Sequence, residues 1–202
     1  MKKTFSLLLI LSSFYATEVF SQSGEIYQIG TQNNYVAGDF YDKVERYKAQ
    51  QRSQNWCWAA CVQMVLKNQG LFVDQCDIVK QGFGQNSCID KPANCFTIEQ
   101  AAGGWNINGR RIKAWVNTNV TANDLIDDLA FKYPLIVGLD MPGQNVGHAY
   151  VLTAIYFSYD SRNVKKPYKV ILRDPWPSNP SRLELNWSDF YSRINCITHV
   201  TF

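Results

Sequence analysis

The segment "WCWAACVQMVL", residues 56–66, constrains the fold of this chain more than any other feature. It carries no charged side chain, and Gln63 is its only carboxamide. Gly70 follows shortly afterwards as a stop signal. A helix that is apolar on nearly all its faces must be enclosed by other parts of the protein. The sequence therefore predicts a helix over residues 56–68 that is buried within a domain.

The N-terminus has the pattern of a secretory signal. Two lysines precede an uncharged apolar run, residues 5–16, which is too short to span a bilayer. Val19 and Ser21 stand where a signal peptidase reads small residues. We therefore expect residues 1–21 to be a signal peptide and the product to be secreted, to the periplasm or out of the cell. No other apolar stretch is long enough to predict a membrane span.

The mature chain is long enough for one domain with a sizeable core. Removal of residues 1–21 leaves 181 residues, and the net charge falls from +3 to +2. The basic residues form no run or stripe, which argues against a nucleic-acid partner. Residues 22–50 alternate loosely between polar and apolar, and we interpret them as an N-terminal arm before a domain over 51–202. We take the protein to be a monomer.

The order of the predicted elements indicates an α+β fold. A second short helix is expected over residues 74–81, followed by a loop. Thr121 and Asp124 have the spacing of a capping box and predict a third helix, which Pro134 ends. Most of the second half reads as strands, with one short helix before the last strand. These strands are expected over 134–140, 147–157, 168–174 and 196–202, and the helix over 186–194.

All six cysteines belong to the mature chain, where an oxidising compartment permits disulfides. If one cysteine is a catalytic thiol, at least one more must be free or bridge to another chain. Cys88 and Cys95 bracket "IDKPAN", in which Pro92 and Asn94 favour a reversal of the chain. We therefore predict a Cys88–Cys95 bridge. At most one further bridge would come from three remaining cysteines, with its members left open: Cys61, Cys76 and Cys196.

Cys57 is the better placed of two candidate nucleophiles. A helix N-terminus activates a thiol through its unpaired N–H groups and its dipole, and Cys57 lies in the first turn while Cys61 lies one turn deeper. The spacing of these two cysteines is not that of a zinc ribbon, and no close second pair of ligands is present, so we expect no metal. A redox motif with two intervening residues is also absent.

A nucleophilic cysteine needs a base and an acceptor that orients the base. The chain has two histidines, and His148 follows Gly147 at the start of a predicted strand, whereas His199 lies three residues from the end. Asp174 ends another predicted strand. Taken singly, His148 and Asp174 are more often structural residues. Together with Cys57 they form the order of a Cys–His–Asp triad.

Three segments carry a family resemblance: "QRSQNWCWAACVQMVL", "GHAYVLTAIYF" and "LRDPWP". They resemble the papain-like cysteine peptidases, in particular the bacterial secreted branch related to plant-pathogen effector proteases and bacteriocin-leader peptidases. The likeness covers about residues 50–202. It implies a nucleophile helix packed on a C-terminal antiparallel sheet, and cleavage of a protein or peptide substrate through an acyl-enzyme without a cofactor.

The resemblance also implies further site residues. Gln51, six residues before Cys57, would bind the developing oxyanion, with Gln54 as its rival. Trp56 either packs in the core or lines the substrate cleft, and we name it as a cleft candidate, while Trp58 is expected in the core. Trp176 would shield the histidine–aspartate contact from water.

Two other functions remain open at this point. The same triad serves amidases, deamidases and transglutaminase-like acyl transferases, because specificity depends on pocket walls that the motifs do not describe. A disulfide-stapled binding module without enzymatic activity is the third reading. A count of free thiols separates the third reading from the others, since three bridges would leave none.

Overall fold

The structure is a computed structural model that describes residues 25–38, 46–131, 133–143 and 146–202. The expected signal peptide, residues 1–21, lies outside the described residues. The helices of the described part are α2 (Cys57–Asn68), α3 (Gln75–Phe83), α4 (Cys95–Ala102), α5 (Ala122–Ala130) and α6 (Trp187–Arg193). Its strands are β1 (Ile26–Gln28), β2 (Asn34–Ala37), β3 (Asn106–Ile107), β4 (Arg110–Arg111), β5 (Lys113–Asn117), β6 (Leu135–Leu139), β7 (His148–Tyr159), β8 (Lys165–Arg173), β9 (Arg182–Asn186) and β10 (Ile194–Thr201).

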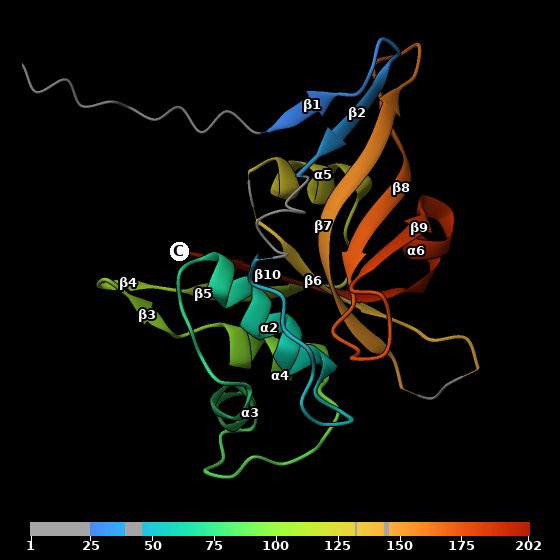
Figure 1. Ribbon diagram of the computed structural model, residues 1–202. Coiled ribbons are helices and arrows are strands. Elements are labelled where there is room, and N and C mark those ends of the chain that lie inside the picture. The colour runs from blue at the N-terminus through green and yellow to red at the C-terminus, as the bar shows by residue number, and fades with distance from the viewer. Residues whose placement is uncertain (1–24, 39–45, 132, 144–145) are drawn as a thin grey trace, which may run out of the picture.

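Eight of these strands form one antiparallel sheet, in which β7 is the central strand (Figure 1). Along one edge, β7 pairs first with β6 and then with β2, and along the other edge it pairs with β8. Helices α2, α3 and α4 contact one another beside the sheet, and α2 packs against β7 and β6. The prediction of an α+β fold is confirmed.

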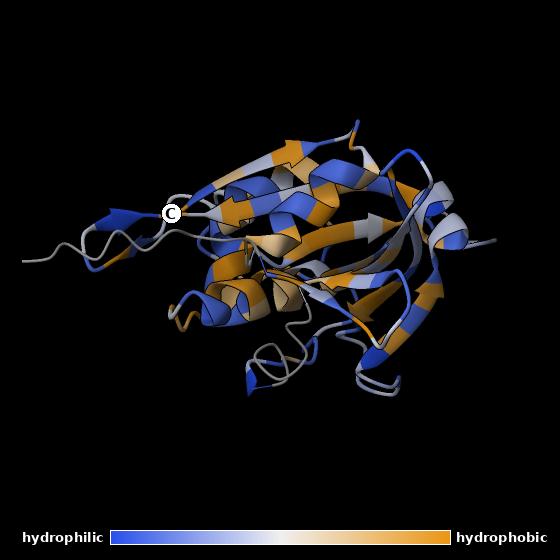
Figure 2. Cartoon of the chain, turned by 90° about the horizontal axis from the view of Figure 1, so that it is seen from above, coloured by the Kyte–Doolittle hydropathy of each residue, from blue (hydrophilic) through white to orange (hydrophobic). Residues whose placement is uncertain are grey.

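Helix α2 is the centre of the core, as its composition predicts. Every side chain from Trp58 to Leu66 is buried, and even the polar Gln63 is only 5% exposed. Gln63 donates to the carbonyl of Val73 at 2.6 Å, so its burial leaves that amide group satisfied. Figure 2 shows hydrophobic segments gathered where the helices and the sheet face one another, and hydrophilic residues on the β3–β4 hairpin.

The capping box predicted for α5 is present. The backbone N–H of Asp124 donates to Thr121 Oγ1 at 3.3 Å, and the N–H of Thr121 donates to Asp124 Oδ2 at 2.9 Å. Two short strands within the expected arm belong to the main sheet, because β1 pairs with β2 and β2 pairs with β7.

Sequence reasoning missed α4, the β3–β4 hairpin, β5 and β9. The signal for α4 was Asn94, whose side chain accepts a hydrogen bond from the backbone N–H of Thr97 at 2.9 Å. Asn94 was interpreted as a turn residue, but an asparagine in extended conformation that bonds three residues ahead is a helix N-cap.

The predicted Cys88–Cys95 bridge is wrong. Cys76 pairs with Cys88, with Cα atoms 5.1 Å apart, and Cys95 pairs with Cys196, with Cα atoms 6.3 Å apart. The error follows from the missed helix: Cys95 is the first residue of α4, and α4 packs against β10, which carries Cys196. The packing of α4 on β10 therefore decides the partner of Cys95, although Cys88 is closer to it in the sequence.

Candidate active site

Cys57 is held at the start of α2 by the two tryptophans that flank it. Trp56 Nε1 donates to the carbonyl of Ile89 at 2.9 Å, and Trp58 Nε1 donates to that of Lys91 at 3.1 Å. The two indoles therefore fix the helix start against one loop. The first N–H groups of a helix have no partner within the helix, so Cys57 stands where unpaired donors gather.

His148 and Asp174 are brought together by the pairing of β7 with β8. His148 is the first residue of β7, and Asp174 directly follows β8. In this antiparallel pair Val151 lies opposite Arg173, so the start of β7 lies beside the end of β8. The Nε2 atom of His148 lies 2.8 Å from Oδ1 of Asp174.

The carboxylate of Asp174 accepts three hydrogen bonds from the described residues. Its Oδ1 also accepts from the backbone N–H of Trp176 at 2.9 Å, and its Oδ2 accepts from Asn179 Nδ2 at 2.7 Å. Burial alone would raise the pKa of Asp174, but the hydrogen bonds from His148, Asn179 and Trp176 outweigh it and lower the pKa below its usual value. The residue is thus held as a carboxylate in a buried place.

The side chain of Cys57 is close enough to His148 to raise the pKa of its imidazole. Because Nε2 faces Asp174, Nδ1 is the ring nitrogen that remains for the thiol. Burial would lower the pKa of His148, but its hydrogen bond to Asp174, the neighbouring Cys57 side chain and the charges of both groups raise the pKa from 6.5 to about 9. The imidazole is therefore protonated at neutral pH.

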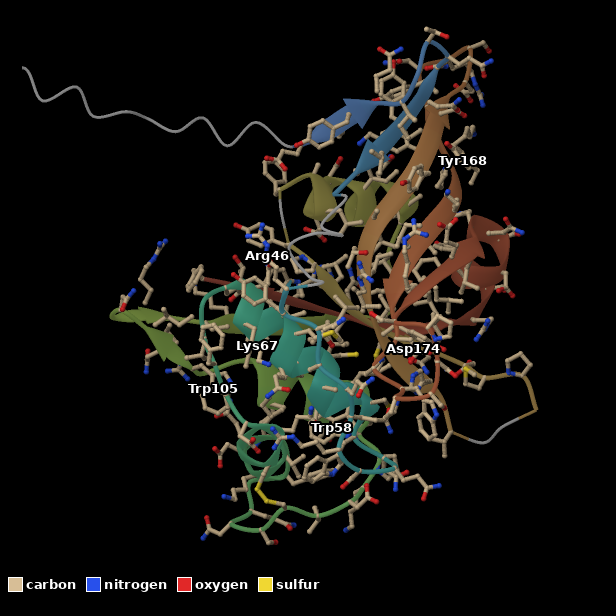
Figure 3. The ribbon with its side chains drawn as sticks, viewed as in Figure 1. Arg46, Trp58, Lys67, Trp105, Tyr168 and Asp174 are labelled. Carbon is tan, nitrogen blue, oxygen red and sulfur yellow. A yellow bond between two sulfur atoms is a disulfide. The ribbon has the colours of Figure 1, made fainter. Side chains whose placement is uncertain are left out.

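Figure 3 shows Asp174 at the end of β8 and Trp58 on α2.

Cys57 and His148 open into a cleft of about 580 Å³. The residues that line it come from the start of α2, the start of α4, β6, the start of β7 with the loop before it, the loop after β8 and the start of β10. The described lining contains no lysine, arginine, aspartate or glutamate. It includes five carboxamides: Gln54, Asn55, Asn94, Asn179 and Asn195.

Gln51 is not among the residues that line this cleft. Its Nε2 atom donates to the carbonyls of Ser53 at 2.9 Å and Gln54 at 2.8 Å, which uses both amide hydrogens. Its Oε1 is buried and accepts no hydrogen bond from the described residues. An oxyanion would therefore have to compete for one of these two donors. Gln54, the rival candidate, lines the cleft.

The tryptophans take different positions. The prediction that Trp56 lies in the substrate cleft is wrong: its side chain is 6% exposed and belongs to the core, because its N–H is used by Ile89. Trp58 is in the core as expected, with one edge on the cleft. Trp176 is 36% exposed, and its ring meets His148 edge-on at a centroid distance of 6.2 Å.

His199 has a different environment from His148. It is buried in β10, stacks on Trp115 with the ring centroids 4.9 Å apart, and lies 2.9 Å from Asp128 Oδ2 through its Nδ1. It does not belong to the lining of the cleft.

Among the cysteines of the described part, Cys57 and Cys61 are free. Cys61 is fully buried, which raises the pKa of its thiol well above the usual value, and the neighbouring Cys57 adds to this. Cys61 is therefore the inert thiol and Cys57 the accessible one. Within the described ranges, no group of three or more His, Cys, Asp or Glu side chains could hold a metal ion.

Asn179 and Asn195 are site residues that sequence reasoning missed. Asn179 follows Asp174 by five residues in the Pro-rich stretch "DPWPSNP", whose turns bring the amide back onto the carboxylate. That stretch was a usable signal for Asn179. Asn195 offered none, because its position depends on how β10 pairs with its neighbour.

Comparison with known proteins decides the family. A family model described as "Papain-like cysteine protease AvrRpt2" matches residues 41–193. The chain belongs to this family. It is a papain-like cysteine peptidase, as the sequence motifs predicted.

A solved structure supports the same fold. The peptidase domain of Streptococcus ComA, a bifunctional ABC transporter involved in a quorum-sensing pathway, matches with a TM-score of 0.54 at 18% identity. The match covers 77% of this chain and 98% of that domain. A search of curated protein sequences gave no match.

Proposed function

We propose that the protein is a secreted peptidase that cleaves peptide bonds with Cys57, His148 and Asp174 as its catalytic triad. The observation that carries the proposal is the pairing of His148 with Asp174, 2.8 Å apart, in the cleft that Cys57 also lines. The raised pKa of His148, about 9, keeps an imidazolium in the cleft that can donate a proton to the leaving amine.

The reaction proceeds in two stages. The Cys57 thiolate attacks the substrate carbonyl carbon, and the His148 imidazolium then gives its proton to the leaving amine, which leaves an acyl-enzyme. The neutral His148 next takes a proton from water, whose oxygen attacks the acyl carbon. Cys57 departs as thiolate, and His148 is again the imidazolium. Asp174 holds the imidazole in the tautomer and orientation that both stages need.

The oxyanion is stabilised by the backbone N–H of Cys57 and by the carboxamide of Gln51. A donor of this kind contributes about 3 kcal/mol to the transition state. Gln51 lies in the turn that leads into α2, and release of one of its two hydrogen bonds to Ser53 and Gln54 would free a donor. Gln54 is the second candidate because it lines the cleft.

Secretion is supported by two separate features. Residues 1–21 have the pattern of a signal peptide, and two disulfides, Cys76–Cys88 and Cys95–Cys196, fit an oxidising compartment. No helix in the described part of the chain is long and apolar enough to cross a membrane.

A proteome-derived peptide library tests the activity and its base together. The parent should cleave peptides and release free carboxyl ends, which distinguishes hydrolysis of the chain from deamidation of glutamine side chains and from transfer to an amine. His148→Ala should lower the acylation rate by several orders of magnitude, because a neutral thiol is a poor nucleophile. The matched control, His199→Ala, should change turnover less than tenfold. Equal losses in both variants, or deamidation without cleavage, would refute the proposal.

A further inference from the structure

We propose that Asn195 is a specificity-determining residue of the cleft, and that it selects substrates whose side chain at this subsite carries a hydrogen-bond donor. The inference rests on the proposed function, because it assigns a role within the same cleft. Asn195 belongs to β10 and lines the cleft beside Cys196, on the strand that the disulfide joins to the start of α4.

A β-bulge directs this side chain. In the pairing of β10 with β6, Ile194 lies opposite Leu139 and Cys196 lies opposite Gly138. Asn195 is therefore an extra residue in β10 without a partner on β6. Bulges of this kind are frequent beside active sites, where they turn a side chain away from the regular alternation of the strand. Here the extra residue is solvent-exposed and reaches the cleft.

Two glycines leave room for its carboxamide. A Cβ atom at Gly138 would collide with Asn195 Oδ1. A Cβ atom at Gly147 would come within 3.2 Å of Asn195 Nδ2 and 2.8 Å of the carbonyl of Leu139. Any side chain at either position would thus displace Asn195, and both glycines lie in the cleft lining next to the strand that carries His148.

Asp140 fixes which way the carboxamide points. Asn195 Nδ2 donates to Asp140 Oδ1 at 3.0 Å, and a carboxylate can only accept, so the NH₂ group must face Asp140. Asp140 is itself anchored, because its N–H donates to the carbonyl of Arg193 at 2.8 Å and its carbonyl accepts from Arg193 Nε at 2.9 Å. No donor among the described residues contacts Asn195 Oδ1. The cleft therefore presents an acceptor oxygen in a fixed orientation.

The described lining contains no lysine or arginine, and its walls include apolar groups such as Ile98, Ala149 and Val146. A substrate atom that cannot donate would leave Oδ1 without a partner, and an anionic side chain would be repelled by Oδ1 and by Asp140 behind it. Threonine and asparagine side chains meet the requirement, whereas valine and aspartate do not.

The test uses thiol-directed peptide electrophiles, which report recognition through the rate of Cys57 modification. Matched probes differ by Thr against Val, or by Asn against Asp, at each of the three positions before the electrophile. At one position the parent should react about tenfold faster with the donor-bearing probe. Asn195→Leu, which keeps the branching of the side chain but removes its polar atoms, should abolish the preference for Thr over Val. Asn119→Leu, at an exposed turn outside the cleft, is the control.

A second variant tests whether the orientation of the Asn195 carboxamide, and not only its presence, sets the preference. Asp140→Asn allows the Asn195 amide to turn its NH₂ group into the cleft, so discrimination between Asn and Asp probes should shrink several-fold. If thermal unfolding shows that Asn195→Leu does not fold, the Asp140→Asn variant alone tests the role of Asn195. Equal rates for matched probes in the parent, or a preference that survives both substitutions, would overturn the role of Asn195 alone. Failure of every probe to modify Cys57 would instead overturn the proposed function, and this inference with it.

Discussion

Asn179 donates a hydrogen bond from its Nδ2 to Oδ2 of Asp174 at 2.7 Å, from five residues further along the same loop. The other carboxylate oxygen is shared by His148 and the backbone N–H of Trp176. One oxygen of Asp174 thus contacts His148, and the other is anchored by Asn179. Asn179 is a positioning residue, since it acts on the imidazole only through this carboxylate.

Asn179→Ala should lower kcat about tenfold and change KM less, because Asp174 loses the anchor that sets its orientation. Asn179→Asp keeps the size of the side chain but places a second negative charge beside Asp174, so it should lower kcat further than alanine does. The same pair of substitutions at the exposed Asn119 serves as control in steady-state kinetics. If the aspartate variant is the more active of the two, the hydrogen bond to Asp174 is not the reason that Asn179 matters.

The pH profile of kcat/KM should report the pKa of His148. The imidazolium must donate a proton to the leaving amine, so activity should fall as pH rises above about 9, where His148 loses that proton. Asp174 raises this pKa through its hydrogen bond and its charge. In Asp174→Asn the alkaline limb should therefore move to lower pH, while an amide oxygen that still accepts from the imidazole preserves part of the rate. An alkaline limb at the same pH in both proteins would mean that another group sets it.

Gln51→Ala should lower kcat by about a hundredfold with little change in KM, as expected for the loss of an oxyanion donor that acts in the transition state. Gln54→Ala should cost less than tenfold. Single-turnover acylation rates of the two variants make the comparison. The opposite ranking would transfer the oxyanion role to Gln54, which already lines the cleft.

The two disulfides should differ in their effect on stability. Cys95–Cys196 spans 101 residues and Cys76–Cys88 spans 12, so the chain-entropy model gives about 5 and about 3 kcal/mol respectively. Replacing both members of each pair with alanine and measuring denaturant unfolding gives the two losses. Because Cys95 and Cys196 also line the cleft, only their replacement should alter substrate turnover. A larger stability loss from the Cys76–Cys88 replacement would contradict this account.

Local patterns in the sequence predicted the parts of the structure that depend on local physics. The buried helix α2 follows from its uninterrupted apolar composition, and the start of α5 follows from Thr121 and Asp124. His148 and Asp174 were found because each stands at a strand end beside a glycine or a proline. Their meeting, however, needed the register of β7 and β8, which the family resemblance supplied and the spacing did not.

The errors concern contacts between distant segments. The partner of Cys95 is decided by the packing of α4 on β10, which lies about a hundred residues away in the chain. Trp56 enters the core because the carbonyl of Ile89 is within reach of its indole, and the position of Asn195 depends on a bulge in β10. No local sequence pattern predicts these three features, since each depends on which elements lie side by side in the folded chain.

The most direct test of the account is labelling of the unreduced protein by a thiol-directed epoxide. The account predicts modification of Cys57 alone, complete loss of labelling in Cys57→Ala and Cys57→Ser, and thermal unfolding of both variants within about 1 kcal/mol of the parent. Cys61→Ala is the matched control and should label like the parent, because Cys61 is buried and not reactive. Labelling that persists in Cys57→Ala but disappears in Cys61→Ala would contradict the account.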